Sequence, residues 1–133
     1  MNQSKFQFSD PELEKIEFNV NSEFEENSFE GITMESITEV KTLELYKAKV
    51  FLTLKVGDGQ ENEPFHIVVK MSAEFFWNEG MDQDRVRRLL KANAPAVLLS
   101  YIRPIVSSLT TQSKYPALNI PFIDFSRNEI IEL

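Results

Sequence analysis

The sequence has no cysteine and a single histidine, and these two shortages remove whole classes of site. Without cysteine the chain has neither a disulfide framework nor a thiolate ligand for a metal ion. His66 is then the one candidate ligand besides oxygen atoms, which excludes a structural zinc site. We therefore expect no metal centre.

Glycine is also scarce, and its placement excludes nucleotide-binding motifs. The four glycines stand at positions 31, 57, 59 and 80, which fits neither a phosphate-binding loop nor a dinucleotide-binding fingerprint. No serine nucleophile in an elbow motif accompanies His66, so this histidine is interpreted as a surface or packing residue. Carboxylates are plentiful, but no spacing marks a pair for acid–base catalysis. We expect no catalytic residues and no cofactor, and the protein is predicted not to be an enzyme.

Long apolar runs are absent, and basic residues are outnumbered. Nowhere do about 18 uncharged apolar residues follow one another, and the N-terminus has no basic segment followed by an apolar run. Twenty-one acidic residues against 14 basic ones leave a net charge of −7, which disfavours the phosphate contacts that dominate nucleic-acid affinity. We expect a cytoplasmic protein that neither inserts into a membrane nor binds nucleic acid.

The acidity is concentrated in the first 40 residues, which hold ten carboxylates and two lysines. One interpretation is an acidic face that binds a basic partner, with Glu23, Glu25 and Glu26 as its candidate residues. The other is a solvated surface that keeps the protein in solution. The sequence leaves both open.

What the chain does contain is the composition of one globular domain. Hydrophobic residues make up 42% of its 133 residues, and no repeat or Pro/Gly/Ser-rich linker divides it. We expect a single domain over residues 1–133, in which residues 1–12 are the candidate flexible segment.

Alternating apolar residues predict strands in the first half of the chain. Residues 14–24 alternate well, and after a loop residues 34–40 resume a weaker pattern. The clearest pattern spans residues 44–56, and another spans residues 65–77. Between these two, Gly57-Asp58-Gly59 tolerates positive φ, which predicts a long antiparallel hairpin.

After Gly80 the apolar period changes to that of a helix. A short helix capped by Asp82 or Asp84 is expected first, followed by a longer helix from about residue 95 to 112 with Pro95 in its first turn. Strands that precede helices predict an α+β fold, in which two C-terminal helices pack on one face of an antiparallel sheet.

The longer helix is too apolar for one sheet to cover. At 100° per residue its apolar side chains span an arc of roughly 200°, whereas about 100° is enough to face one sheet. We infer that a second subunit covers the rest, and an incompletely covered helix in a monomer is the alternative. Pro104 in the helix interior predicts a bend. The candidate subunit-interface residues are Val97, Leu98, Tyr101, Ile102, Ile105 and Leu109.

The C-terminal third carries an ordered set of motifs. A proline opens the longer helix, a Tyr-x-Arg lies within it at Tyr101 and Arg103, and Tyr-Pro-Ala-Leu-Asn-Ile follows at 115–120. Ile123-Asp124-Phe125 ends the series. In order and spacing this segment closely resembles the SecB family of protein-export chaperones, and the predicted strands lie where the strands of that family would.

The resemblance implies a SecB-like sheet of four antiparallel strands with the helices on one face. It also implies a homodimer that extends the sheet, and a homotetramer whose long helices lie between two sheets. Non-native polypeptides would bind in hydrophobic grooves, and acidic sheet residues would engage the export motor ATPase. By position, the groove candidates in this sequence are Phe24, Phe29, Trp77, Tyr115, Leu118, Ile120 and Phe122.

Two functions from different classes follow. The first is ATP-independent binding of unfolded or non-native polypeptides by a homo-oligomeric chaperone that is linked to protein export. The second is an interaction protein of the same fold that binds a specific folded partner through its acidic surface, without general chaperone activity.

Overall fold

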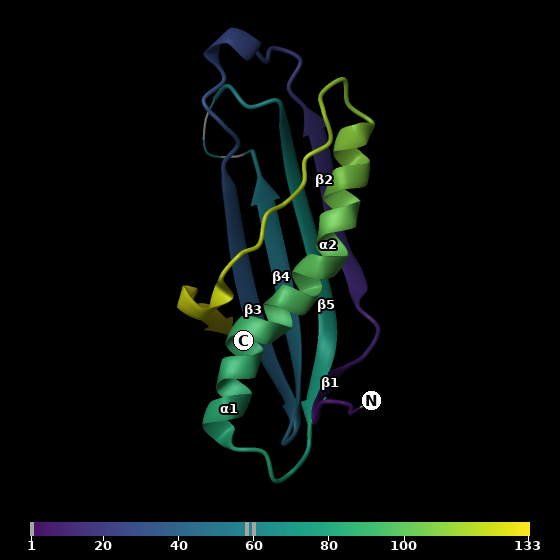
Figure 1. Ribbon diagram of the computed structural model, residues 1–133, viewed down its shortest axis with the longest axis vertical. Coiled ribbons are helices and arrows are strands. Elements are labelled where there is room, and N and C mark those ends of the chain that lie inside the picture. The colour runs from purple at the N-terminus through teal and green to yellow at the C-terminus, as the bar shows by residue number, and fades with distance from the viewer. Residues whose placement is uncertain (1, 58, 60) are drawn as a thin grey trace.

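A six-stranded sheet carries one long, broken helix across one face in the computed structural model, which describes residues 2–57, 59 and 61–133 (Figure 1). The strand order is β1-β5-β4-β3-β6, and β2 also pairs with β5. The strands are β1 (Phe6–Phe8), β2 (Glu12–Val20), β3 (Met34–Glu44), β4 (Lys47–Val56), β5 (Phe65–Trp77) and β6 (Ile130–Glu132). The helical elements are η1 (Glu26–Ser28), α1 (Gln83–Arg88), η2 (Leu89–Asn93), α2 (Ala94–Thr111) and η3 (Phe125–Arg127).

The sheet is larger than the four antiparallel strands that the family resemblance implies, and it is mixed. β6 pairs in parallel with β3 at Thr38–Val40, and β1, from the segment 1–12, pairs antiparallel with the end of β5. Each of these two strands is three residues long, too short for an alternating pattern to be recognised in the sequence. The rings of Phe6 and Phe8 stack on that of Phe75 at 5.6 and 5.8 Å, which holds β1 on the sheet.

The hairpin predicted from residues 44–56 and 65–77 is present, but its first strand begins later. β3 runs on to Glu44, and Leu45 and Tyr46 make the turn into β4. The inward rows of both strands are buried as the alternation predicts, and they form the centre of the core. The buried residues of these inward rows are Ala48, Val50, Leu52, Leu54 and Val56 of β4, and Phe65, Ile67, Val69, Met71, Ala73 and Phe75 of β5.

The two predicted C-terminal helices are joined into one, which corrects the expected fold. Asp82 caps α1 by accepting the Arg85 N–H at 3.1 Å, and a five-residue π turn, η2, then leads directly into α2. The sequence predicts a new helix at Pro95 because proline is common in a first turn. Here the backbone stays helical through Ala94, and the π turn rearranges the hydrogen bonds just before the proline, which has no N–H to donate.

α2 packs on β4 and β5, with more of its circumference buried than one narrow stripe. Leu98, Ile102 and Val106 are fully buried in the core of the chain itself. Leu98 and Ile102 are therefore unavailable to a second subunit, which corrects the predicted interface, whereas Tyr101 is 42% exposed. The helix axis changes direction near its middle, as Pro104 predicts (Figure 1). The remaining interface candidates, Val97, Ile105 and Leu109, are half-buried.

Gly57 begins the β4–β5 connection at a backbone position that excludes a side chain. Its φ is 81°, its N–H donates to the Thr33 carbonyl oxygen at 2.8 Å, and a Cβ would collide with the Phe65 carbonyl oxygen. Asp58, the next residue of the predicted turn, lies outside the described residues. We expect Gly57→Ala to lower the free energy of unfolding by about 1–3 kcal/mol, measured by urea unfolding.

Gly80→Ala is the matched control for this substitution. Among the described residues no heavy atom lies within 4 Å of a Cβ placed at Gly80, and its φ is not positive. The control should leave the free energy of unfolding within about 0.5 kcal/mol of the unsubstituted protein. A Gly57→Ala protein as stable as the control would show that the β4–β5 connection adjusts freely.

Candidate functional site

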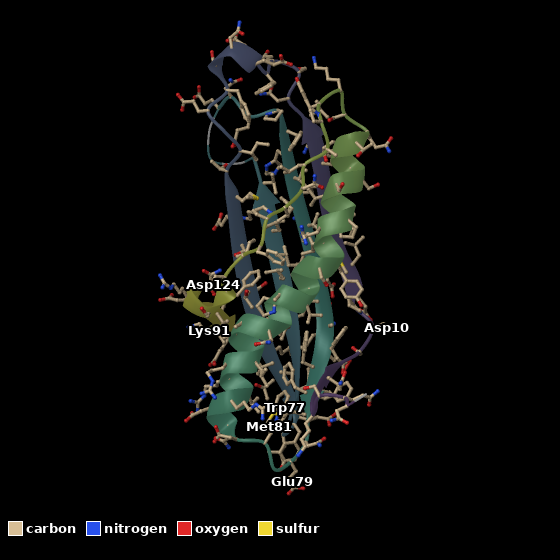
Figure 2. All side chains as sticks on the ribbon, viewed as in Figure 1. Asp10, Trp77, Glu79, Met81, Lys91 and Asp124 are labelled. Atoms are coloured by element: carbon tan, nitrogen blue, oxygen red, sulfur yellow. The ribbon has the colours of Figure 1, made fainter. Side chains whose placement is uncertain are left out.

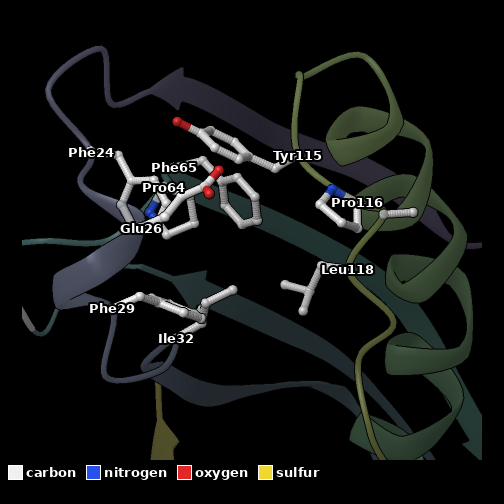
Figure 3. A pocket seen from close by; sticks show the side chains of 10 residues that line it. Phe24, Glu26, Phe29, Ile32, Pro64, Phe65, Tyr115, Pro116 and Leu118 are labelled. Carbon is white, nitrogen blue, oxygen red and sulfur yellow. The ribbon is translucent and has the colours of Figure 1, made fainter.

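An apolar cleft of about 430 Å³ lies between the loop that joins β2 to β3 and the segment that follows α2. We call it the aromatic cleft. Figure 3 shows side chains of the β2–β3 loop on one side of the opening and those of Tyr115 and Leu118 on the other. Its lining residues are Phe24, Glu26, Phe29, Ile32, Pro64, Phe65, Tyr115, Pro116, Ala117 and Leu118.

Three aromatic rings pack edge to face at the cleft. The ring of Phe24 lies 5.5 Å from that of Phe29 and 5.1 Å from that of Tyr115, with interplanar angles of 79° and 85°. Edge-to-face packing is a favourable arrangement for aromatic pairs. Phe24 and Tyr115 are half-buried, and Phe29 is 45% exposed. The rings therefore hold one another in place while they still present apolar surface to the opening.

Buried Glu63 anchors the β2–β3 loop that forms one wall. Its carboxylate accepts hydrogen bonds from the Thr33 N–H at 2.5 Å, the Thr33 hydroxyl at 3.1 Å and the Gly59 N–H at 3.2 Å. The Asn62 side chain accepts the Glu25 N–H at 2.9 Å and donates to the Glu25 carbonyl oxygen at 2.8 Å. Since hydrogen bonds to a buried carboxylate are strong, this wall is preformed.

Buried Thr110 anchors the opposite wall. Its hydroxyl accepts the Leu118 N–H at 2.8 Å and donates to the Val106 carbonyl oxygen at 2.9 Å. Farther along, the Arg103 Nε–H donates to the Ile120 carbonyl oxygen at 2.8 Å. These contacts tie the segment after α2 to the helix, so its side chains face the β2–β3 loop at a fixed separation.

Glu26 is the one charged side chain that lines the cleft among the described residues. Glu23 and Glu25 are exposed on the same loop. One of the three carboxylates predicted as an acidic face, Glu26, therefore brings a negative charge to the cleft. Lys114 lies 5.3 Å from the centroid of the Tyr115 ring, which places a cation beside the other wall.

The structure brings together four of the predicted groove residues, Phe24, Phe29, Tyr115 and Leu118. It does not bring in the other three. Trp77 stacks on Phe6 at 6.1 Å at the other end of the sheet (Figures 1 and 2). Ile120 is buried in the core at 1% exposure. Phe122 is 94% exposed, and the Arg103 guanidinium lies 5.6 Å from its ring.

Sequence reasoning did not assign Ile32, Pro64, Phe65, Pro116 or Ala117 to the site. Pro116 and Ala117 stand between two predicted groove residues in the Tyr-Pro-Ala-Leu motif, so the motif itself was an available signal. Pro64 and Phe65 have no comparable signal, because their place beside the cleft depends on the Glu63 anchor rather than on a local pattern.

The cleft offers apolar surface for binding. No group of three or more His, Cys, Asp or Glu side chains in the described part of the chain could hold a metal ion. Across residues 2–57, 59 and 61–133, no helix combines the length and apolarity needed to cross a membrane. Edges of aromatic rings and proline suit the apolar side chains of another polypeptide.

Two solved structures share this fold. A SecB-like chaperone of Mycobacterium tuberculosis, Rv1957, solved in complex with a ChAD peptide from the Rv1956 HigA1 antitoxin, matches with a TM-score of 0.70, at 15% identity, over 90% of this chain and 91% of that one. A protein of unknown function from Streptococcus agalactiae matches with a TM-score of 0.51, at 17% identity, over 88% of this chain and 97% of that one. At these identities the two matches show the fold alone.

Sequence relatives extend the comparison. The protein-export protein SecB of Pseudomonas fluorescens is 30% identical over 95 residues, which are 71% of this chain and 60% of that protein. The SecB of Alcanivorax borkumensis is 28% identical over 80 residues, 60% of this chain and 51% of that protein. The chain thus spans about half to three fifths of the length of these relatives. The family model described as preprotein translocase subunit SecB matches residues 17–128, most of the sequence, and the chain therefore belongs to the SecB family.

Proposed function

We propose that this protein is an ATP-independent chaperone that binds unfolded or non-native polypeptide segments in the aromatic cleft. The observation that carries the proposal is the edge-to-face group of Phe24, Phe29 and Tyr115, which keeps apolar ring surface open to solvent between two anchored walls. Membership of the SecB family supports it. So does the related fold of the Mycobacterium tuberculosis SecB-like chaperone, whose structure contains a bound peptide.

An unfolded chain is the ligand that suits such a site. Its apolar side chains are accessible one at a time, whereas a folded protein hides most of them. Ring edges accept many apolar side chains at modest affinity, because they provide area without a fixed hydrogen-bond pattern. Glu26 at the cleft adds a preference for segments in which an apolar residue has a lysine or arginine nearby.

An aggregation assay tests the proposal. Without ATP, the protein should suppress the aggregation of several unrelated, chemically unfolded proteins at near-stoichiometric ratios, and it should not bind their native forms. If the protein suppresses the aggregation of none of these clients, the proposed chaperone function is wrong.

The alternative of a folded partner on a separate acidic face finds no support in the geometry. Glu26 lines the cleft, and the Glu25 backbone is hydrogen-bonded to Asn62 within the loop that walls it. Glu26 is therefore better explained as part of the polypeptide site than as part of an independent surface.

The link to protein export rests on the family, and the outward face of the sheet does not strengthen it. Carboxylates on this face are paired with lysines: Glu74 with Lys47 at 3.7 Å, Glu14 with Lys49 at 3.7 Å, and Glu39 with Lys70 at 3.5 Å. A mixed surface of this kind lacks the single sign of charge that an acidic dock for the export motor ATPase would need.

We infer that a second copy of the chain covers the β2 edge of the sheet. β2 pairs with β5 alone among the described strands, and Leu13, Ile16 and Val20 lie opposite the inward residues of β5, so they face the side of the sheet that carries α2. They are 50%, 40% and 47% exposed, and Tyr101 adds to the apolar surface on that side. The outer backbone edge of β2 is thus open, and its exposed apolar row favours pairing with the same strand of a second copy. The product would be a homodimer or half of a homotetramer.

A further inference from the structure

A group of cations lies at the end of the molecule opposite to the aromatic cleft. The group belongs to α1 and the π turn η2, at the lower end of Figure 1, whereas the β2–β3 loop is at the upper end. Here a hollow of about 520 Å³, which we call the basic pocket, shares no lining residue with the aromatic cleft. Its lining residues are Arg85, Arg88, Leu89, Lys91, Ala92, Asn93 and Ser126.

The three cations of the basic pocket form no ion pair within the described part of the chain. The nearby carboxylates of α1 have other partners. Asp84 pairs with Arg87, which does not line the pocket, at 3.2 Å, and Asp82 accepts the Arg85 backbone N–H as the helix cap. In a chain of net charge −7, an unneutralised group of cations at one end is a local feature rather than an effect of composition.

Asp124 is the remaining acidic group to be considered, because it lies on the same side of the molecule as Lys91 (Figure 2). Its carboxylate accepts hydrogen bonds from the Ser126 hydroxyl at 2.6 Å and the Ser126 N–H at 3.0 Å. These bonds hold the pKa of Asp124 below its ordinary value, and Arg127 lowers it further. The carboxylate is thus engaged within η3, and it does not line the pocket.

The π turn is an independent observation at the same place. Four of the seven lining residues, Leu89, Lys91, Ala92 and Asn93, belong to η2. A π turn in the middle of a helix is an irregularity that is frequent at functional sites, because it changes the directions of the side chains around it. Here it sets Lys91 in the pocket together with the two arginines of α1.

We propose that the basic pocket docks an acidic, extended segment of another polypeptide. The three cations stand three residues apart in one continuous helical segment, and all three line the same hollow. Carboxylates on one face of an extended segment repeat about every 6.7 Å, so a short segment presents several of them to the three cations. Arginine suits this ligand because its planar guanidinium binds a carboxylate through two hydrogen bonds.

A free phosphate group fits the pocket less well than an acidic segment. Phosphate sites usually surround the ion with converging backbone N–H groups at a helix N-terminus or a glycine-rich turn. The basic pocket instead gathers three side-chain cations, and Leu89 and Ala92 add apolar surface to its lining. Because the pocket and the cleft lie at opposite ends of the molecule, the acidic segment and an unfolded client can be bound at the same time (Figure 1).

Fluorescence anisotropy with a labelled peptide of alternating glutamate and serine tests this proposal. Serine keeps the probe out of the aromatic cleft. The variant Arg85→Ala/Arg88→Ala/Lys91→Ala should bind the peptide about tenfold more weakly than the unsubstituted protein, since three exposed charge pairs are lost. The matched control, Lys5→Ala/Lys41→Ala/Lys114→Ala, removes the same net charge from exposed positions outside the pocket and should change the affinity by less than about threefold.

Other outcomes overturn the proposal. An equal loss of affinity in the control would show attraction by net charge, without a pocket. If the unsubstituted protein does not bind the peptide, the proposed site is wrong. The proposal is also wrong if the pocket binds inorganic phosphate or anionic phospholipid vesicles but not the peptide. A smaller oligomer in the pocket variant, measured by light scattering, would identify the occupant as a second copy of this chain. Circular dichroism checks that the exposed substitutions leave the fold intact.

Discussion

Phe29→Ala combined with Tyr115→Ala is expected to weaken the binding of an unfolded client by roughly 100-fold. The two rings flank Phe24 at 5.5 and 5.1 Å, so their loss removes ring surface from both walls of the cleft. Aromatic anchors in such sites typically contribute about 2 kcal/mol or more each, and their effects are not additive. The measurement is anisotropy of a labelled, permanently unfolded protein titrated with each variant.

Phe122→Ala is the matched control, because it removes the same ring as Phe29→Ala from a position outside the cleft. Phe122 is 94% exposed and does not line the site. Its removal should leave client affinity within about twofold of the unsubstituted protein. If instead Phe122→Ala weakens binding as much as the cleft variant, clients bind exposed aromatic residues in general, and the aromatic cleft is not the site.

The position of the cleft was partly available in the sequence. Tyr115 and Leu118 belong to an ordered motif, Phe24 ends the strand predicted at residues 14–24, and Phe29 stands in the interruption that follows it. What the sequence does not show is that Glu63 reaches Thr33, 30 residues away, and so fixes the end of the β2–β3 loop. That contact depends on the fold, because both residues are polar and neither follows a local pattern.

Trp77 shows how a predicted strand can itself correct a predicted site. It ends the 13-residue strand β5, and Phe65, which lines the cleft, begins it. At about 3.3 Å per residue the two ends of such a strand lie roughly 40 Å apart, so both residues cannot line one cleft. Strand length alone therefore argues against Trp77 as a groove residue.

Short elements set the limit on predicting the fold. β1 and β6 are held by partners far away in the sequence, Phe75 for the rings of β1 and Thr38–Val40 for the backbone of β6. The 18-residue helix α2, in contrast, has enough turns for its apolar period to be read directly. The helix is also apolar over a wide arc, as its sequence indicates. The sheet and the segments beside the helix bury more of that arc than contact with one flat sheet would.

Ile16→Glu combined with Tyr101→Glu is expected to convert a homo-oligomer into single chains of 15.4 kDa. Both residues are about two-fifths exposed in the lone chain, so a carboxylate at either position remains solvated there. In a subunit interface the same carboxylate would be buried without a partner, which costs roughly 3–5 kcal/mol for each uncompensated charge. Light scattering measures the change as a fall in mass from at least two chains to one.

Leu45→Glu is the control that separates an interface from a general effect of added charge. Leu45 is 85% exposed in the β3–β4 turn, away from the apolar row of β2, so a carboxylate there should leave the mass unchanged. If the unsubstituted protein is itself a single chain at micromolar concentration, no second copy covers β2. A single chain should still bind clients, because Glu63 and Thr110 anchor both walls of the aromatic cleft within that chain. Client binding and assembly are therefore independent proposals. Anisotropy of the labelled client tests the first, and light scattering tests the second.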